Sequence, residues 1–208
     1  MDGPARRRRL AAARLMLVVE ACPEALLDAA LRGGVDVVQL RDKELGDAEL
    51  VAASAPFRRA CDRHGALFIL NDRPDLVEAC GADGVHVGRD DASVAEARVL
   101  VGAERLVGLS THAREEMDAA QDVDYLGVGT IFTTPTKRED AVGLDLVRVA
   151  AEAARVPWFA IGGIDLSNVG LVAAAGAHGV AVVRAIRDAE DPESAARELR
   201  AALTRPAG

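Results

Sequence analysis

The sequence predicts an α/β protein of one domain, a (β/α)8 TIM barrel, and three observations indicate this fold. Eight short apolar runs alternate with helical patterns rich in Ala, Leu and Arg over 208 residues, near the lower size limit of the fold. The runs have few polar interruptions, as is typical of parallel strands covered by helices. After the first run come Glu20, Ala21, Cys22 and Pro23, not the glycine-rich turn of an open doubly wound sheet, which also usually has fewer repeats.

The alternation assigns each element in turn. Runs rich in Val, Ile and Leu predict strands at 15–19, 36–40, 67–70, 84–87, 105–109, 124–128, 158–161 and 179–183. The segments between them predict helices at 24–32, 47–64, 74–80, 92–101, 112–121, 144–155, 166–175 and 192–203. Gly33, Gly81 and Gly176 are expected to act as C-caps of three helices, at the end of the barrel where residues serve stability.

The barrel domain is expected to span 14–204, preceded by an N-terminal arm or short helix over 1–13. Arg6 to Arg9 within this segment are interpreted as a loosely attached, solvated arm or the start of a helix. With the apolar residues that follow, this start weakly resembles a signal peptide. However, Arg14 and Glu20 interrupt the apolar stretch and no small-residue cleavage site follows, so a cytoplasmic location is expected.

Composition excludes several classes of protein. Half of the residues are hydrophobic but only 3% are aromatic, so the core must be aliphatic. A net charge of −8 argues against a nucleic-acid partner, and no apolar run approaches the roughly 18 residues of a membrane span. Cys22, Cys61 and Cys80 show no C-x-x-C spacing and indicate buried thiols in a reducing compartment, without a disulfide framework or zinc site.

Polar residues that follow the strands are the candidate site, because active sites of such barrels lie at the carboxyl ends of the strands. Gln39 and Arg41 alternate with Leu40, so both are expected to point inward, and Lys43 follows two residues later. Three side chains able to bind anionic oxygen within five residues favour a phosphate site. The alternative is an ordinary charged loop.

Two carboxylates follow the next two strands. Asp72 comes after Asn71 at the end of the third strand, and Asp91 comes after the fourth. Each could simply cap the helix that follows it, and Pro74 suits a first helical turn. Because the two strands are adjacent and parallel, the carboxylates are expected to converge. One or two carboxylates with phosphate oxygens and waters is a common way to hold Mg²⁺.

The loop from Gly129 to Gly143 contains three threonines and a lysine between 133 and 137. Hydroxyl groups can donate to phosphate oxygens and an ammonium group can neutralise them. The chain has only two lysines, Lys43 and Lys137, so a lysine here suggests a placed point charge. A solvated connection with an incidental lysine is the alternative.

A second anion site is expected after the last two strands, where barrels commonly bind a phosphate group. Gly162 and Gly163 would let the backbone approach a ligand, and Val183 and Arg184 follow the eighth strand. His86 is either a satisfied interior residue or a polar group lining the site. No zinc-ligand spacing and no base for a nucleophilic Ser110 were found in the sequence.

Together these residues resemble the thiamine-phosphate synthase family. The matching motifs are Q-L-R-D-K at 39–43, N-D-R at 71–73, D-G-V-H-V-G-x-D-D at 83–91, G-L-S-T-H at 108–112, G-x-G-x-I-F-x-T-x-T-K at 127–137 and A-I-G-G-I at 160–164. They are collinear from about residue 15 to 200. Two departures are the first-strand end, where the family more often has a Thr-Asp pair, and Arg184, where many members have serine.

The resemblance implies a Mg²⁺-assisted transferase that joins a hydroxymethylpyrimidine diphosphate to a thiazole phosphate and releases pyrophosphate. It assigns the pyrimidine diphosphate to Gln39, Arg41, Lys43 and Asn71, with Ser110 and Lys137 also in contact. Asp72 and Asp91 would ligate Mg²⁺. Arg41, Lys43, Ser110 and Lys137 would be catalytic, and Thr134, Thr136, Gly163, Val183 and Arg184 would bind the thiazole phosphate.

The implied partners are therefore small molecules, with no nucleic acid and no membrane, and assembly into a homo-oligomer is left open. Three alternatives remain: a thiazole tautomerase on the same barrel, a sugar-phosphate epimerase or isomerase, and a non-catalytic barrel that senses a phosphate ligand. The tautomerase family tends to lack the Q-x-R-x-K pattern and the second aspartate, both of which this chain has.

Overall fold

A computed structural model describes residues 1–133 and 142–204 and confirms the predicted barrel. Eight parallel strands hydrogen-bond in chain order, and the first pairs with the eighth to close the sheet. Their bounds lie within two residues of the predicted ones. The strands are β1 (Leu15–Val19), β2 (Val37–Leu40), β3 (Leu67–Asn71), β4 (Gly84–Val87), β5 (Leu106–Thr111), β6 (Tyr125–Val128), β7 (Trp158–Ile161) and β8 (Gly179–Val182).

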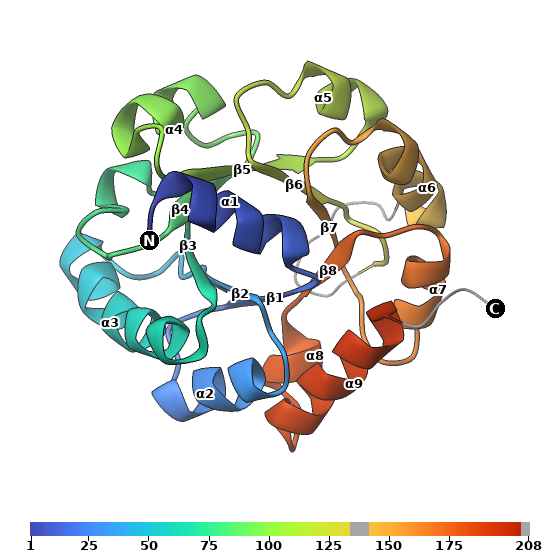
Figure 1. The fold of residues 1–208 in the computed structure, drawn as a ribbon, viewed down its shortest axis with the longest axis horizontal. Helices are drawn as coiled ribbons and strands as arrows, with labels where there is room; N and C mark the ends of the chain where they lie inside the picture. Colours follow the sequence, from blue (N-terminus) through green and yellow to red (C-terminus); the bar gives the residue numbers. More distant parts are fainter. Residues whose placement is uncertain (134–141, 205–208) are drawn as a thin grey trace.

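Helices surround the sheet (Figure 1). In the described chain they are α1 (Gly3–Ala12), α2 (Glu24–Arg32), α3 (Asp47–His64), α4 (Val94–Val101), α5 (Arg114–Ala119), α6 (Gly143–Ala153), α7 (Val169–Ala174), α8 (Arg184–Arg187) and α9 (Pro192–Thr204). The predicted helix at 74–80 is wrong, because only a 3-10 turn, η1 (Pro74–Leu76), forms there. The C-cap prediction is confirmed at Gly33, but the left-handed conformation falls on its neighbour Gly34, with φ of +106°.

The hydrophobic core has two parts, because successive residues of a strand point to opposite faces. Leu15, Leu17 and Val19 of β1 face the helices and belong to the larger cluster between sheet and helices. Met16 and Val18 face the barrel interior, where a smaller cluster includes Tyr125 and the α1 residue Leu10. The sheet therefore encloses a packed interior, and the space for ligands lies beyond its strand ends.

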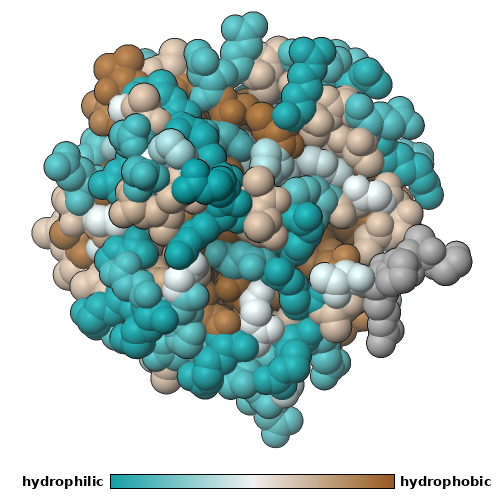
Figure 2. Space-filling model, viewed as in Figure 1, coloured by the Kyte–Doolittle hydropathy of each residue, from teal (hydrophilic) through white to brown (hydrophobic). Residues whose placement is uncertain are grey.

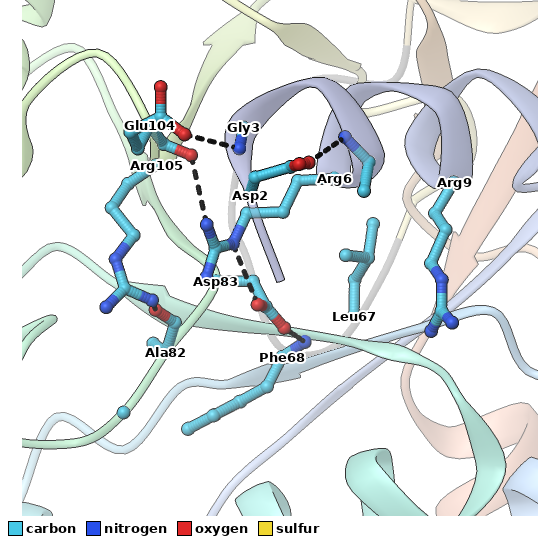
Figure 3. A network of polar contacts seen from close by, with 12 residues as sticks. Asp2, Gly3, Arg6, Arg9, Leu67, Phe68, Ala82, Asp83, Glu104 and Arg105 are labelled. Carbon is cyan, nitrogen blue, oxygen red and sulfur yellow. Dashed lines mark hydrogen bonds and ion pairs between the residues drawn. The ribbon is translucent and has the colours of Figure 1, made fainter.

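Helix α1 lies across the amino-terminal end of the barrel (Figure 1). Its side chains Arg6 and Leu10 are 7% and 1% exposed, so the expectation of a loosely attached arm is wrong for these residues, although the predicted helix is present. Arg6 Nε donates to Asp83 Oδ1 at 2.9 Å, and the Gly3 amide donates to Glu104 Oε2 at 2.6 Å (Figure 3). Sequence could not reveal these pairings, because they join residues 77 and 101 positions apart.

Asp83 is the centre of this buried network. Its other oxygen accepts from Arg58 Nη1 at 2.8 Å and from the Phe68 amide at 3.0 Å. Burial alone would raise the pKa of Asp83, but the hydrogen bonds from Arg58 and Phe68 and the charge of Arg58 hold it below its usual value. The carboxylate thereby joins α1 and α3 to the start of β3.

The surface on the α1 side is mainly hydrophilic (Figure 2). Apolar exceptions occur on α4, where Val99 and Leu100 are 84% and 58% exposed. Among the described residues, no helix combines the length and apolar composition that crossing a bilayer requires. The three cysteines are free thiols, and Cys61 and Cys80 are buried as predicted, whereas Cys22 is only half-buried.

Candidate active site

Three neighbouring cavities open at the carboxyl ends of the strands, where the sequence placed the site. We call them the acidic cavity, of about 290 Å³, the inner cavity, of about 90 Å³, and the glycine cavity, of about 440 Å³. The acidic cavity is bounded by residues after β2, β3 and β4, and the glycine cavity by residues after β7 and β8. Arg41 lines all three, so this residue borders both of the larger spaces.

The predicted residues of β2 and β3 lie together at the mouth. Gln39 is 3% exposed and its Nε2 donates to Asn71 Oδ1 at 2.6 Å, which fixes the orientation of both amides. Lys43 Nζ lies 3.5 Å from Asp72 Oδ2, and its side chain is 57% exposed. An exposed ammonium beside a cavity is free to move toward an anion that enters it.

Asp72 and Asp91 converge as predicted, and neither serves as the helix cap that the sequence left open. Ser93 caps α4 through its hydrogen bond with the Glu96 amide, while Asp91 Oδ2 accepts from the Gly88 amide at 2.9 Å. Asp72 has a φ of +61° and precedes η1, which has no side-chain cap. Both carboxylates are therefore held toward the acidic cavity.

The charge of Asp91 disfavours the ionised form of Asp72. Burial raises the pKa of Asp72 to about 6, a hydrogen bond and the charge of Asp91 add to the rise, and Lys43 opposes it. A divalent cation would relieve this repulsion, and hard oxygen donors suit Mg²⁺. Within 1–133 and 142–204 no cluster of three or more His, Cys, Asp or Glu could hold a metal. A two-carboxylate set fits an ion that takes its remaining ligands from phosphate and water.

A hydrogen-bonded chain runs from the barrel interior to this mouth. Tyr125 Oη lies 3.1 Å from His86 Nδ1, and His86 Nε2 lies 2.9 Å from Ser110 Oγ. His86 and Ser110 line both the inner and the acidic cavity. His86 therefore satisfies both interpretations of the sequence, since it is hydrogen-bonded and it lines the site.

Two glycines make room for these rings. A Cβ added at Gly108 would lie 2.1 Å from Tyr125 Cζ, and one at Gly127 would lie 3.1 Å from His86 Cε1. The pattern of glycines on β5 and β6 was visible in the sequence. The sequence did not indicate that the Tyr125 ring fills this space, because Tyr125 looks like any other apolar residue of a strand.

The site also contains residues that the sequence did not single out. His112 is only partly exposed and lines the acidic and inner cavities. Arg89 Nη2 donates to Glu116 Oε1 at 2.7 Å, and the His112 amide donates to Glu116 Oε2 at 2.6 Å. These contacts tie the loop after β4 to α5, and no spacing in the sequence indicated them.

The glycine cavity lies after β7 and β8, where the sequence predicts a second anion site. Gly162 and Gly163 have φ values of +111° and +62°, a region that favours glycine. A Cβ on Gly163 would lie 2.8 Å from Phe132 Cβ, so these residues pack closely against the segment that follows β6. Val183 and Arg184 line the same cavity, and Arg184 is exposed there.

The loop after β6 is described only at its two ends. Thr130 lines the glycine and inner cavities, and its carbonyl accepts from the Val142 amide at 3.0 Å. Both ends of the loop therefore meet at the site. Thr134, Thr136 and Lys137 lie outside the described residues, and their assignment stays a prediction.

Fold and site together define a class of protein: a (β/α)8 barrel with polar cavities at the carboxyl ends of its strands, where enzymes of this fold have their active sites. Comparison with known proteins specifies the class further. The family model for thiamine monophosphate synthase matches residues 15–186. The chain therefore belongs to the thiamine monophosphate synthase family, and like its relatives it is a transferase of thiamine biosynthesis.

Individual relatives support the same family. The thiamine-phosphate synthase of Thermobifida fusca is 49% identical, over 95% of this chain and 95% of its own length. That of Gloeobacter violaceus is 51% identical over 89% of this chain, which spans only 56% of the longer relative. The solved thiamine phosphate pyrophosphorylase from Pyrococcus furiosus superposes with a TM-score of 0.86 at 30% identity, covering 95% of this chain and 97% of that one.

Proposed function

We propose that the family reaction proceeds here as a Mg²⁺-assisted dissociative substitution. The substrates would be 4-amino-2-methyl-5-(diphosphooxymethyl)pyrimidine and a thiazole phosphate, and the products thiamine monophosphate and pyrophosphate. The observation that carries the proposal is the presence of two cavities with different linings on either side of Arg41. One has two carboxylates and Lys43, and the other has a glycine backbone and Arg184.

The acidic cavity would take the pyrimidine diphosphate. Gln39 and Asn71 already hold each other at 2.6 Å, so the free donors and acceptors of their amides are oriented before the substrate binds. Arg41 and Lys43 would neutralise diphosphate oxygens. Bound between Asp72, Asp91 and the diphosphate, Mg²⁺ would supply positive charge to the leaving group.

The glycine cavity would hold the thiazole phosphate, with Gly163, Val183 and Arg184 about its phosphate and Thr134 and Thr136 from the loop after β6. The bond between the pyrimidine methylene carbon and the diphosphate oxygen would break first, since the electron-rich aminopyrimidine can stabilise a cation. The thiazole nitrogen would then attack with its lone pair, and no general base is needed. The protein's task is to stabilise the departing charge and align the thiazole.

Lys137 tests the leaving-group role. If it neutralises departing pyrophosphate, Lys137→Ala lowers kcat by about a hundredfold or more, as loss of a group that stabilises transition-state charge does. The KM for thiazole phosphate should change much less. An unchanged kcat would remove Lys137 from the leaving-group role, and Lys43→Ala gives the comparison with the chain's other lysine.

One assay separates the candidate functions. Purified protein is incubated with Mg²⁺ and both substrates, and pyrophosphate and thiamine monophosphate are measured. The proposal expects both products in equal amounts and neither when one substrate is omitted. Isomerisation of a thiazole phosphate alone would indicate a tautomerase, and binding without pyrophosphate release would indicate a sensor. Loss of turnover with a chelator, restored by Mg²⁺, tests the metal.

We also propose a cellular setting for the protein. Free thiols at Cys61 and Cys80 suit a reducing compartment, and we place the protein in the cytoplasm. Its partners would be the two small-molecule substrates. Light scattering on the purified chain decides whether it forms a homo-oligomer, and measurement in cell fractions decides the location.

A further inference from the structure

The direction of the hydrogen bonds from Tyr125 through His86 to Ser110 follows from the burial of Tyr125. Tyr125 is 1% exposed and lies in the apolar interior cluster. Within the described part of the chain, the hydrogen bond recorded for its hydroxyl group is the one with His86 Nδ1 at 3.1 Å. Burial raises the pKa of the phenol, so it keeps its proton. A buried hydroxyl that keeps its proton must donate it, because an unmade hydrogen bond in an apolar interior is costly.

The direction of this first bond fixes the imidazole. If Tyr125 donates to Nδ1, that nitrogen is an acceptor, and neutral His86 carries its proton on Nε2. Nε2 lies 2.9 Å from Ser110 Oγ, so it donates to the serine oxygen. The Ser110 hydroxyl proton then points to a different acceptor. Ser110 lines the acidic cavity with Arg41 and Asn71, where a diphosphate oxygen would lie.

The opposite tautomer would reverse the outcome. With the proton on Nδ1, Ser110 would donate to Nε2 and turn its oxygen lone pairs toward the cavity. Lone pairs repel an anionic ligand, whereas an O–H dipole attracts it and forms a charge-assisted hydrogen bond. Whether Ser110 presents its proton or its lone pairs to the cavity therefore depends on the Tyr125 hydroxyl group, which acts through His86.

We infer that Tyr125 is a positioning residue, which holds His86 in the Nε2-protonated tautomer and so makes Ser110 a hydrogen-bond donor toward the diphosphate of the pyrimidine substrate. This inference rests on the proposed function, since it needs an anionic group in the acidic cavity. The space made by Gly108 and Gly127 for the two rings shows that this arrangement is built into the barrel.

A double-mutant cycle provides the kinetic test. Ser110→Ala should lower kcat about a hundredfold, as loss of one donor to a developing anion does. Tyr125→Phe keeps the ring and should lower kcat about tenfold, with little change in KM for thiazole phosphate, since one hydrogen bond is redirected rather than removed. In the Ser110→Ala background, Tyr125→Phe should lower kcat by less than about twofold, because residues acting through one another are not additive.

Thr111→Val is the matched control. It also deletes one buried hydroxyl group, next to Ser110 on β5, but Thr111 lies on the helix-facing side of the sheet. Its Oγ1 donates to the Gly127 carbonyl at 3.4 Å. It should shift the thermal midpoint about as much as Tyr125→Phe while leaving kcat within about twofold. An equal loss of kcat in both variants would make the Tyr125 effect structural and overturn the inference.

Nitrogen NMR of ¹⁵N-histidine-labelled protein measures the tautomer directly in the wild type. The four histidines are assigned with His86→Gln as a reference. The inference expects protonated Nε2 and unprotonated Nδ1. Protonated Nδ1, or a Tyr125→Phe effect of the same size with and without Ser110, overturns it. A wild type that releases no pyrophosphate refutes the proposed function, whereas a Ser110-dependent rate with no Tyr125 effect refutes only the positioning role.

Discussion

Removal of the Arg6 side chain measures what the helix across the barrel end contributes to stability. The Arg6 and Asp83 side chains are 8% and 3% exposed, so Arg6→Ala breaks a buried pair, a change that costs about 3–5 kcal/mol when the remaining charge has no other partner. Asp83 keeps Arg58 and the Phe68 amide. With two of its three partners retained, we expect a loss of about 2 kcal/mol in the free energy of unfolding. In a domain of this size that lowers the thermal midpoint by about 4–8 °C.

Thermal unfolding followed by circular dichroism, with Arg8→Ala as the matched control, checks this value. Arg8 is on the same helix but exposed. Its loss should change the free energy of unfolding by no more than about 0.5 kcal/mol. At temperatures where both variants are folded, kcat should equal that of the wild type, because the pair lies at the end of the barrel opposite the site. Equal midpoint shifts in the two variants, or a lower kcat in folded Arg6→Ala, would refute the reasoning.

Three further predictions concern pH, the glycine cavity and the metal. The folded-state pKa of Asp83 is lowered, so its contribution to the stability of the fold is complete above about pH 4 and is lost as pH falls through the folded-state pKa. Asp83→Asn should therefore flatten the acid side of a plot of unfolding free energy against pH. An unchanged slope would contradict this. Gly163→Ala should raise the KM for thiazole phosphate about tenfold, because the φ of Gly163 is +62° and an alanine there is strained. Gly170→Ala is the control and should leave this KM unchanged, because a Cβ added at Gly170 meets no atom within 4 Å. Asp72→Asn should raise the Mg²⁺ concentration needed for half-maximal turnover, and an identical Mg²⁺ titration would remove Asp72 from the metal site.

The barrel was predictable because its signal is repeated and local. Each strand is an apolar run bounded by a turn, so its position follows from a few neighbouring residues. The helix at 74–80 failed because Asp72 to Gly81 is too short a segment for helical periodicity to be tested, and Pro74 suits a 3-10 turn as well as a helix. The four-residue α8 is too short to produce any periodic pattern.

The site was predictable where its residues follow strand ends in register. Asp72 and Asp91 come together because parallel strands align their carboxyl ends, whatever the loops do. The roles of Arg6 and Tyr125 could not be predicted from the sequence, and the physical reason is the same for both. The partners of each lie far away in sequence, and neither a charged residue near the amino terminus nor an aromatic residue in a strand indicates where its polar atoms point.

The close fit of Gly108 against Tyr125 limits how the interior of this barrel can be redesigned. A methyl group at position 108 would overlap the phenol ring, so no side chain can be added there while a six-membered ring remains at 125. A smaller residue at 125 would relieve the overlap but leave a void and remove one hydrogen-bond partner of His86. A library that varies position 108 alone should therefore return almost only glycine, and one that varies position 125 alone should return mainly Tyr and Phe. Larger changes require both positions to be varied together, with position 86 included.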